Sequence, residues 1–124
     1  PMTLVGQPPP SPVLKQGLDL LARGKDDEGE QVVKKAAQHA KGRHGSGSHP
    51  LALAYADLAR FHLRQGRLER AANEFEHAAK GPLPAEEQER KDRLAMLLGY
   101  GAALGRLGQL EAAERVLRRC VPFA

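Results

Sequence analysis

The chain of 124 residues has little of several things that many folds depend on. It has one cysteine and no tryptophan, and aromatic residues make up only 4% of the sequence. The single cysteine, Cys120, excludes a disulfide within the chain and gives no sign of an oxidising compartment. No run approaches the roughly 18 apolar residues of a membrane span, and residues 1–12 lack the charged and then apolar order of a secretory signal. We therefore expect no membrane span and a cytoplasmic location.

A block of charge of one sign is also missing. The formal net charge is +4, yet acidic and basic residues are interleaved, as in Arg67, Glu69, Arg70, Glu74 and Glu76. Mixed charge of this kind is typical of solvated helix faces. A nucleic-acid binder usually combines a dense basic stripe with aromatic side chains that stack on bases. We therefore expect no nucleic-acid partner.

The sequence carries no recognisable catalytic or cofactor motif. It has no phosphate-binding loop, no dinucleotide fingerprint and no serine-centred elbow. His44 and His49 flank a glycine-rich segment, but a metal site needs three or four rigid ligands, and no cysteine or carboxylate lies near them in the sequence. Cys120 has no activating neighbour that the sequence identifies. We therefore expect no enzymatic activity, no metal and no cofactor.

The abundant residues are alanine, leucine, arginine and glutamate, which all favour helix, and similar residues recur at a fixed distance. Gly24, Gly66 and Gly108 are separated by 66 − 24 = 42 and 108 − 66 = 42 residues. Each glycine lies between two runs whose apolar residues are three or four apart, the spacing of one helix face. The sequence therefore predicts six helices in three antiparallel hairpins, with each glycine ending the first helix in the left-handed conformation.

Small residues recur at one level of each predicted hairpin. They are Gly17 and Gly29 in the first, Ala59 and Ala71 in the second, and Gly101 and Ala113 in the third. A small side chain there lets two antiparallel helices approach closely, and a larger one would strain the hairpin. His62 lies on the inner face of its helix and is expected to be packed or half-exposed. One hairpin cannot bury both of its apolar faces, so the hairpins are expected to stack.

The second unit carries the pattern of a known family. The pattern consists of Tyr55, Leu58 and Ala59, then Gly66 and Leu68, then Ala71, Phe75 and Ala78. It resembles a tetratricopeptide repeat, whose period is about 34 residues, and the 42-residue period resembles the longer variant of kinesin light chains and many bacterial proteins. The resemblance implies an all-α right-handed superhelix, an α-solenoid with units at about 11–42, 50–83 and 85–122 in a repeat domain of residues 11–124. Residues 1–10 are expected to form a disordered or extended proline-rich tail.

The two connections between units differ in composition. Residues 41–48 are rich in glycine and serine and predict a flexible loop that takes up most of the extra length. Residues 81–84 are a brief break. Glu86 and Glu87 then predict a helix start with acids near its positive end, and this helix is expected to run unbroken to about Leu107.

The resemblance also implies a binding surface, a concave groove that is lined by the first helix of each unit and holds an extended peptide or a partner helix. The candidate residues are Leu14, Lys15 and Leu18 in the first unit, Asp57, Arg60 and Arg64 in the second, and Leu98, Ala102 and Arg106 in the third. Peptide-clamping members often carry asparagines where this chain has Ala56-Asp57 and Leu98-Gly99. Because arginine forks pair well with carboxylates, an acidic partner segment with apolar anchors is expected. The alternative is that the arginines only solvate the surface or pair with Asp57 and nearby glutamates.

These observations predict a scaffold or adaptor module that binds another protein or a peptide. A first alternative is self-assembly into a homo-oligomer through uncapped terminal helices, with an apolar C-terminal edge of Val116, Leu117, Val121 and Phe123. A second alternative is a regulatory or sensor domain of a longer protein.

Overall fold

The computed structural model describes residues 10–120, and the secondary structure in this range is entirely helical. The elements are α1 (Pro12–Ala22), α2 (Asp26–His44), α3 (His49–Arg64), α4 (Leu68–Ala78), α5 (Glu87–Arg106) and α6 (Leu110–Arg118). The prediction of an all-α fold with six helices is confirmed for this part of the chain. Residues 1–9 of the predicted tail, and Val121 and Phe123 of the predicted C-terminal edge, lie outside the described residues. None of the helices in residues 10–120 is long and apolar enough to cross a membrane.

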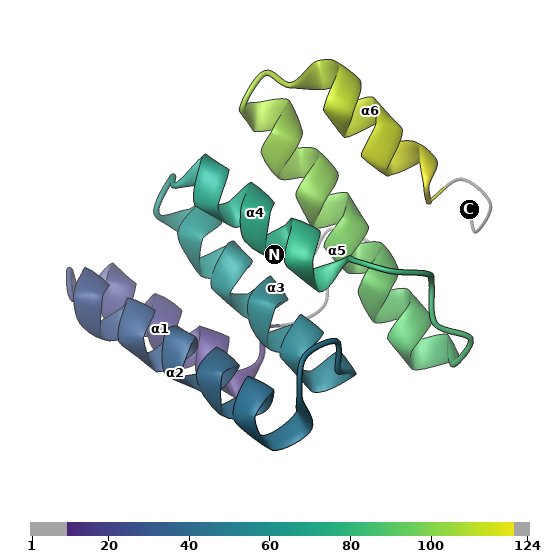
Figure 1. Ribbon diagram of the computed structural model, residues 1–124. Coiled ribbons are helices and arrows are strands. Elements are labelled where there is room, and N and C mark those ends of the chain that lie inside the picture. Colours follow the sequence, from purple (N-terminus) through teal and green to yellow (C-terminus); the bar gives the residue numbers. More distant parts are fainter. Residues whose placement is uncertain (1–9, 121–124) are drawn as a thin grey trace.

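The helices form hairpins that follow one another in chain order across the molecule (Figure 1). Each helix contacts the next one along the chain, and α3 also contacts α1 and α5. The first helices of the hairpins end at residues 22, 64 and 106, and the second helices begin at residues 26, 68 and 110. Both sets of boundaries are spaced 42 residues apart, so the sequence period is also the period of the helix boundaries.

The first helix of every hairpin ends in the same way. Gly24, Gly66 and Gly108 have φ angles of +76°, +80° and +82°, in the left-handed region that costs glycine least. In all three turns the amide after the glycine donates a 2.9 Å hydrogen bond to the carbonyl oxygen five residues earlier. The predicted helix ends are therefore confirmed.

The first hairpin is closed almost backbone to backbone. A Cβ atom at Gly29 would lie 2.7 Å from the carbonyl oxygen of Gly17, and one at Gly17 would lie 2.6 Å from a methyl carbon of Val33. In the second hairpin the same level is occupied by Ala59 and Ala71, which are fully buried. The prediction that small residues let the helices approach closely is confirmed for the first hairpin.

Buried side chains form two clusters along the stack. The smaller cluster consists of Leu14, Val33, Leu58 and Phe61 and joins α1, α2 and α3. The larger cluster joins α3, α4, α5 and α6, and Phe75 is its largest fully buried side chain. Since both clusters include residues of α3, this helix holds the first hairpin to the rest of the chain.

The loop between the first two hairpins is shorter than predicted. The sequence predicts a flexible segment over residues 41–48, but α2 continues to His44, so the first half of that prediction is wrong. Lys41, Arg43 and His44 lie in the last turn of α2, where positive charge stabilises the negative end of the helix dipole. Gly45, with a φ angle of +86°, follows the helix.

The early start of α5 is confirmed. The carboxylate of Glu86 accepts hydrogen bonds from the backbone amides of Gln88 at 3.1 Å and Glu89 at 2.7 Å. These two bonds lower the pKa of Glu86 below its usual value, as expected for a carboxylate that caps a helix. The helix then runs without a break to Arg106.

Candidate interaction face

The predicted groove residues all belong to α1, α3 and α5. We use the name odd-helix face for the side of these helices that carries Lys15, Asp57, Arg60, Arg64, Leu98, Ala102 and Arg106. Because α3 contacts both α1 and α5, equivalent positions in successive units lie on adjacent helices, whose axes are about 8–10 Å apart where they pack. Arg64 and Arg106 are such a pair, since they are the last residues of α3 and α5.

Leu14 does not reach this surface, which corrects its prediction as a groove residue. Its side chain is 2% exposed and packs against Val33, Leu58 and Phe61. It lies three residues before Gly17, on the side of α1 that faces α2. Leu18 is half-buried against the same cluster, so α1 offers mainly the exposed Lys15 to a partner.

The centre of the odd-helix face is paired within the protein. The hydroxyl of Ser11 donates a 2.7 Å hydrogen bond to Oδ2 of Asp57, and Nη1 of Arg60 lies 3.7 Å from Oδ1. Burial raises the pKa of Asp57, although the Ser11 hydrogen bond and the charge of Arg60 oppose the shift. Burial also lowers the pKa of Arg60. These contacts connect the start of α1 to α3, and they fit the alternative in which Arg60 pairs with Asp57.

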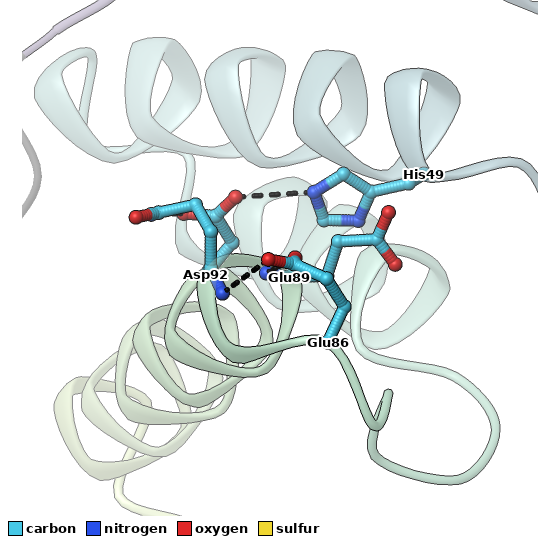
Figure 2. A network of polar contacts seen from close by, with 5 residues as sticks. His49, Glu86, Glu89 and Asp92 are labelled. Carbon is cyan, nitrogen blue, oxygen red and sulfur yellow. Dashed lines mark hydrogen bonds and ion pairs between the residues drawn. The ribbon is translucent and has the colours of Figure 1, made fainter.

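A second polar contact joins α3 to α5. Figure 2 shows His49 at the start of α3 facing Asp92 of α5, with Glu86 beside them. Nε2 of His49 lies 3.1 Å from Oδ2 of Asp92, whose Oδ1 accepts a 3.0 Å hydrogen bond from Gln88. Nδ1 of His49 is buried and has no hydrogen-bond partner within residues 10–120. The His49–Asp92 pair therefore joins the start of α3 to α5.

The C-terminal ends of α3 and α5 carry cations without an ion-pair partner in residues 10–120. Arg64 and Arg106 are exposed, and neither forms an ion pair with another described residue. Leu98 is 47% exposed and Ala102 is also exposed. This part of the odd-helix face therefore combines free guanidinium groups with apolar surface.

A buried polar cluster on the other side of α3 was not predicted. His62 is 3% exposed. Its Nδ1 lies at 2.6 Å, in hydrogen-bond contact, from Oε1 of Glu74, and its Nε2 lies 3.6 Å from Oε1 of Glu30. Glu30 also lies 3.8 Å from one nitrogen each of Arg67 and Arg70. Of the two predicted outcomes for His62, packed or half-exposed, the structure shows the packed one. Its partners come from α2 and α4, and no local spacing identifies them.

The other residues considered for chemistry do not gather into a site. Within residues 10–120, no group of three His, Cys, Asp or Glu side chains is placed to hold a metal ion. His44 is exposed at the end of α2. Cys120 is half-buried against the larger core cluster, and burial raises the pKa of its thiol.

The predicted C-terminal edge is partly inside the fold. Val116 is 8% exposed and belongs to the larger core cluster, which corrects its prediction as an edge residue. Leu117 packs over Gly101, where a Cβ atom would lie 2.6 Å from its Cδ2, yet it stays 39% exposed. Leu110 is 69% exposed. The surface of α6 therefore carries Leu110 and Leu117 as its large apolar side chains.

Comparison with protein-family models, with curated proteins and with solved structures gave no match to this chain.

Proposed function

We propose that the protein is a tetratricopeptide-type interaction module that binds an acidic segment of another protein on the odd-helix face. The repeated helix boundaries, the shared glycine turns and the small residues inside each hairpin support this family and a right-handed solenoid. Fold alone does not fix a function, so the proposal depends on the surface that the odd helices present.

The observation that carries the proposal is a pair of arginines at equivalent ends of α3 and α5 that have no ion-pair partner among the described residues. Arg64 and Arg106 project from adjacent helices whose axes pack about 8–10 Å apart, a spacing that suits two carboxylates seven residues apart on a helix, about 10.5 Å. Each guanidinium can form a bidentate pair with a carboxylate.

The apolar part of the proposed site lies farther along α5. Leu98 precedes Arg106 by two helical turns, about 12 Å, and Ala102 lies between them on the same side of the helix. A partner segment that carries an apolar residue about 12 Å from its acidic pair would cover Leu98 while its carboxylates meet the arginines. Arg60 is less suited to this role because Asp57 already pairs with it.

A peptide library displayed on phage tests the proposal. We expect selection on the wild-type chain to enrich peptides that combine paired acidic residues with an apolar residue. The double variant Arg64→Glu/Arg106→Glu should then weaken binding of the selected peptides at least about 100-fold, because two charge-assisted hydrogen-bonding groups worth about 1.5–3 kcal/mol each are lost.

The matched control is Lys34→Glu/Lys35→Glu on α2, which makes the same change in net charge at two exposed residues away from the odd-helix face. This control should keep binding within a few-fold of the wild type. Selection of neutral or basic peptides, or equal losses for the two double variants, would contradict the proposed site.

Self-association is a second candidate function, favoured by the exposure of Leu110 and Leu117 on α6. Two apolar side chains on the surface of one helix form a small patch that a second copy would cover. In sedimentation equilibrium the mean mass should then rise with concentration, and Leu110→Gln should suppress the rise. A monomeric mass at all concentrations would exclude this function.

A further inference from the structure

A cleft of about 380 Å³ lies beside the connections between hairpins, where α2 passes into α3 and α4 passes into α5. Its volume is in the range of small-ligand sites, about 300–1,000 Å³. Its lining includes the polar side chains of Lys41, Ser46, Ser48, Tyr55, Lys80 and Arg93. None of the residues that define the odd-helix face lines the cleft, so it is separate from the proposed partner site.

The lysine and arginine side chains that line the cleft have no acidic side chain among them. Lys41 comes from the last turn of α2, Lys80 follows α4, and Arg93 lies in α5. No aspartate or glutamate is among the lining residues. Lys41 and Lys80 are exposed and form no ion pair in the described part of the chain. A concave surface with cations alone raises the local concentration of anions.

Arg93 is the buried donor at this site. Its side chain is 9% exposed, and its Nη1 donates hydrogen bonds to the carbonyl oxygens of Lys80 at 2.8 Å and Pro82 at 3.3 Å. Its Nε is buried and has no acceptor among residues 10–120. Burial lowers the pKa of Arg93, and repulsion from Arg119 outweighs attraction from Glu89. A buried cation without a carboxylate is costly, and an anion in the cleft would offset that cost.

Further donors line the same space. Ser48 caps α3 by accepting a 3.3 Å hydrogen bond from the amide of Leu51, which leaves its hydroxyl hydrogen for another acceptor. Ser46 supplies a second hydroxyl. The rings of Tyr55 and His77 stack with centroids 5.6 Å apart and form a flat wall. The positive end of the α3 dipole also lies here, next to the cations.

We propose that this cleft binds an anion of the phosphate-monoester class. The donors come from α2, from the α2–α3 loop, from the segment after α4 and from α5, so they approach the space from different sides. A tetrahedral group with several acceptor oxygens satisfies such donors better than a planar carboxylate, which accepts mainly in one plane. The site does not depend on the proposed partner binding, because it uses other residues.

Amide chemical shifts of the ¹⁵N-labelled chain test the proposal. Inorganic phosphate is added at constant ionic strength, with chloride as the replaced ion. We expect saturable shifts at Gly47 and Gly81, which line the cleft. Gly66 and Gly108 are the internal controls, because they lie at the other end of the hairpins, about 24 Å away along a helix of 16 residues.

The variant Lys41→Ala/Lys80→Ala should weaken phosphate binding about tenfold or more, because it removes two of the three cations. Its control, Lys34→Ala/Lys35→Ala, removes the same charge from two exposed residues of α2 that do not line the cleft and should leave binding unchanged. Arg93→Gln should also weaken binding, with helicity followed by circular dichroism. The lysine pair keeps the test valid if that variant does not fold.

Two further probes separate the sources of the anion. Free O-phosphoserine that binds as well as a phosphoserine peptide would support a small metabolite, and a peptide that binds about tenfold tighter would support a phosphorylated protein segment. The proposal is overturned if Gly47 and Gly81 show no saturable shift, or if both lysine double variants lose the same affinity. Arg64→Glu/Arg106→Glu should retain phosphate binding, so this proposal and the proposed function can fail separately.

Discussion

One added methyl group at Gly29 should destabilise the first hairpin. The Cβ atom of an alanine there would lie 2.7 Å from the carbonyl oxygen of Gly17 and 3.1–3.2 Å from ring carbons of Phe61. The ring can shift, but the oxygen belongs to the backbone of α1 and cannot rotate away. Gly29→Ala therefore forces α1 and α2 apart or bends one of them.

The size of the effect follows from two opposing contributions. Replacing glycine by alanine inside a helix stabilises it by about 1 kcal/mol, and overpacking a tightly closed site costs about 1–3 kcal/mol. We expect a net destabilisation of about 1 kcal/mol. Gly42→Ala is the matched control in the same helix, because a Cβ atom there meets no atom within 4 Å. That variant should be stabilised by about 0.5–1 kcal/mol.

Urea denaturation of the two variants measures the difference. With a slope of about 1.5 kcal/mol per molar urea, the midpoints should differ by about 1 M, and Gly29→Ala should unfold first. Unchanged slopes would show that both variants keep the same two-state transition. A Gly29→Ala variant as stable as Gly42→Ala would refute the close approach of α1 and α2.

Three other properties can be tested directly. His62→Leu should cost about 1–3 kcal/mol in urea denaturation, since Glu30 and Glu74 lose their buried partner; a change within experimental error would show that the cluster contributes nothing to stability. Burial raises the pKa of Asp57 above its ordinary value of 3.8, so the folded state holds this proton more tightly than the unfolded state. The stability that Asp57 contributes is then fully present below pH 3.8 and is lost as the pH rises through the folded pKa. Thermal unfolding of Asp57→Asn should show a smaller fall in stability over that window, and an identical pH profile would contradict the shift. Because burial raises the pKa of Cys120, iodoacetamide should modify its thiol more slowly than a cysteine peptide at the same pH, and urea should remove the difference in a mass-spectrometric time course.

The hairpins were predictable because their signals are local in the sequence. A helix end at Gly24, Gly66 or Gly108 needs only a residue that tolerates positive φ, and a close helix pair needs only small residues at matching levels. The wrong prediction of a loop over residues 41–44 was also based on local sequence. The glycine and serine content of residues 41–48 suggested a loop, whereas cations at the end of α2 and the length available before Gly45 let the helix continue.

The surface was harder to predict because it depends on contacts between elements far apart in the sequence. Leu14 and Lys15 are neighbours, and only the packing of α1 against α2 decides which of them is buried. The pairing of Arg60 depends on Asp57, which Ser11 of another unit helps to hold. His62 meets acidic residues from two other helices, and no pattern within one helix indicates such partners. The cleft also could not be predicted from local sequence, since Lys41, Lys80 and Arg93 come from separate segments.

The unequal helix lengths have a consequence for how such a chain could be modified. In the proposed tetratricopeptide family a helical hairpin needs about 34 residues, and the period here is 42. Much of the surplus lies in the extension of α2 to His44 and in the early start of α5 at Glu87. The same stretches, with the connections beside them, carry Lys41, Ser46, Ser48, Lys80 and Arg93. Shortening both would leave the glycine turns in place while removing the walls of the cleft and the His49–Asp92 contact between α3 and α5. The surplus length can therefore be varied to change the cleft while the glycine turns that mark the repeat stay in place.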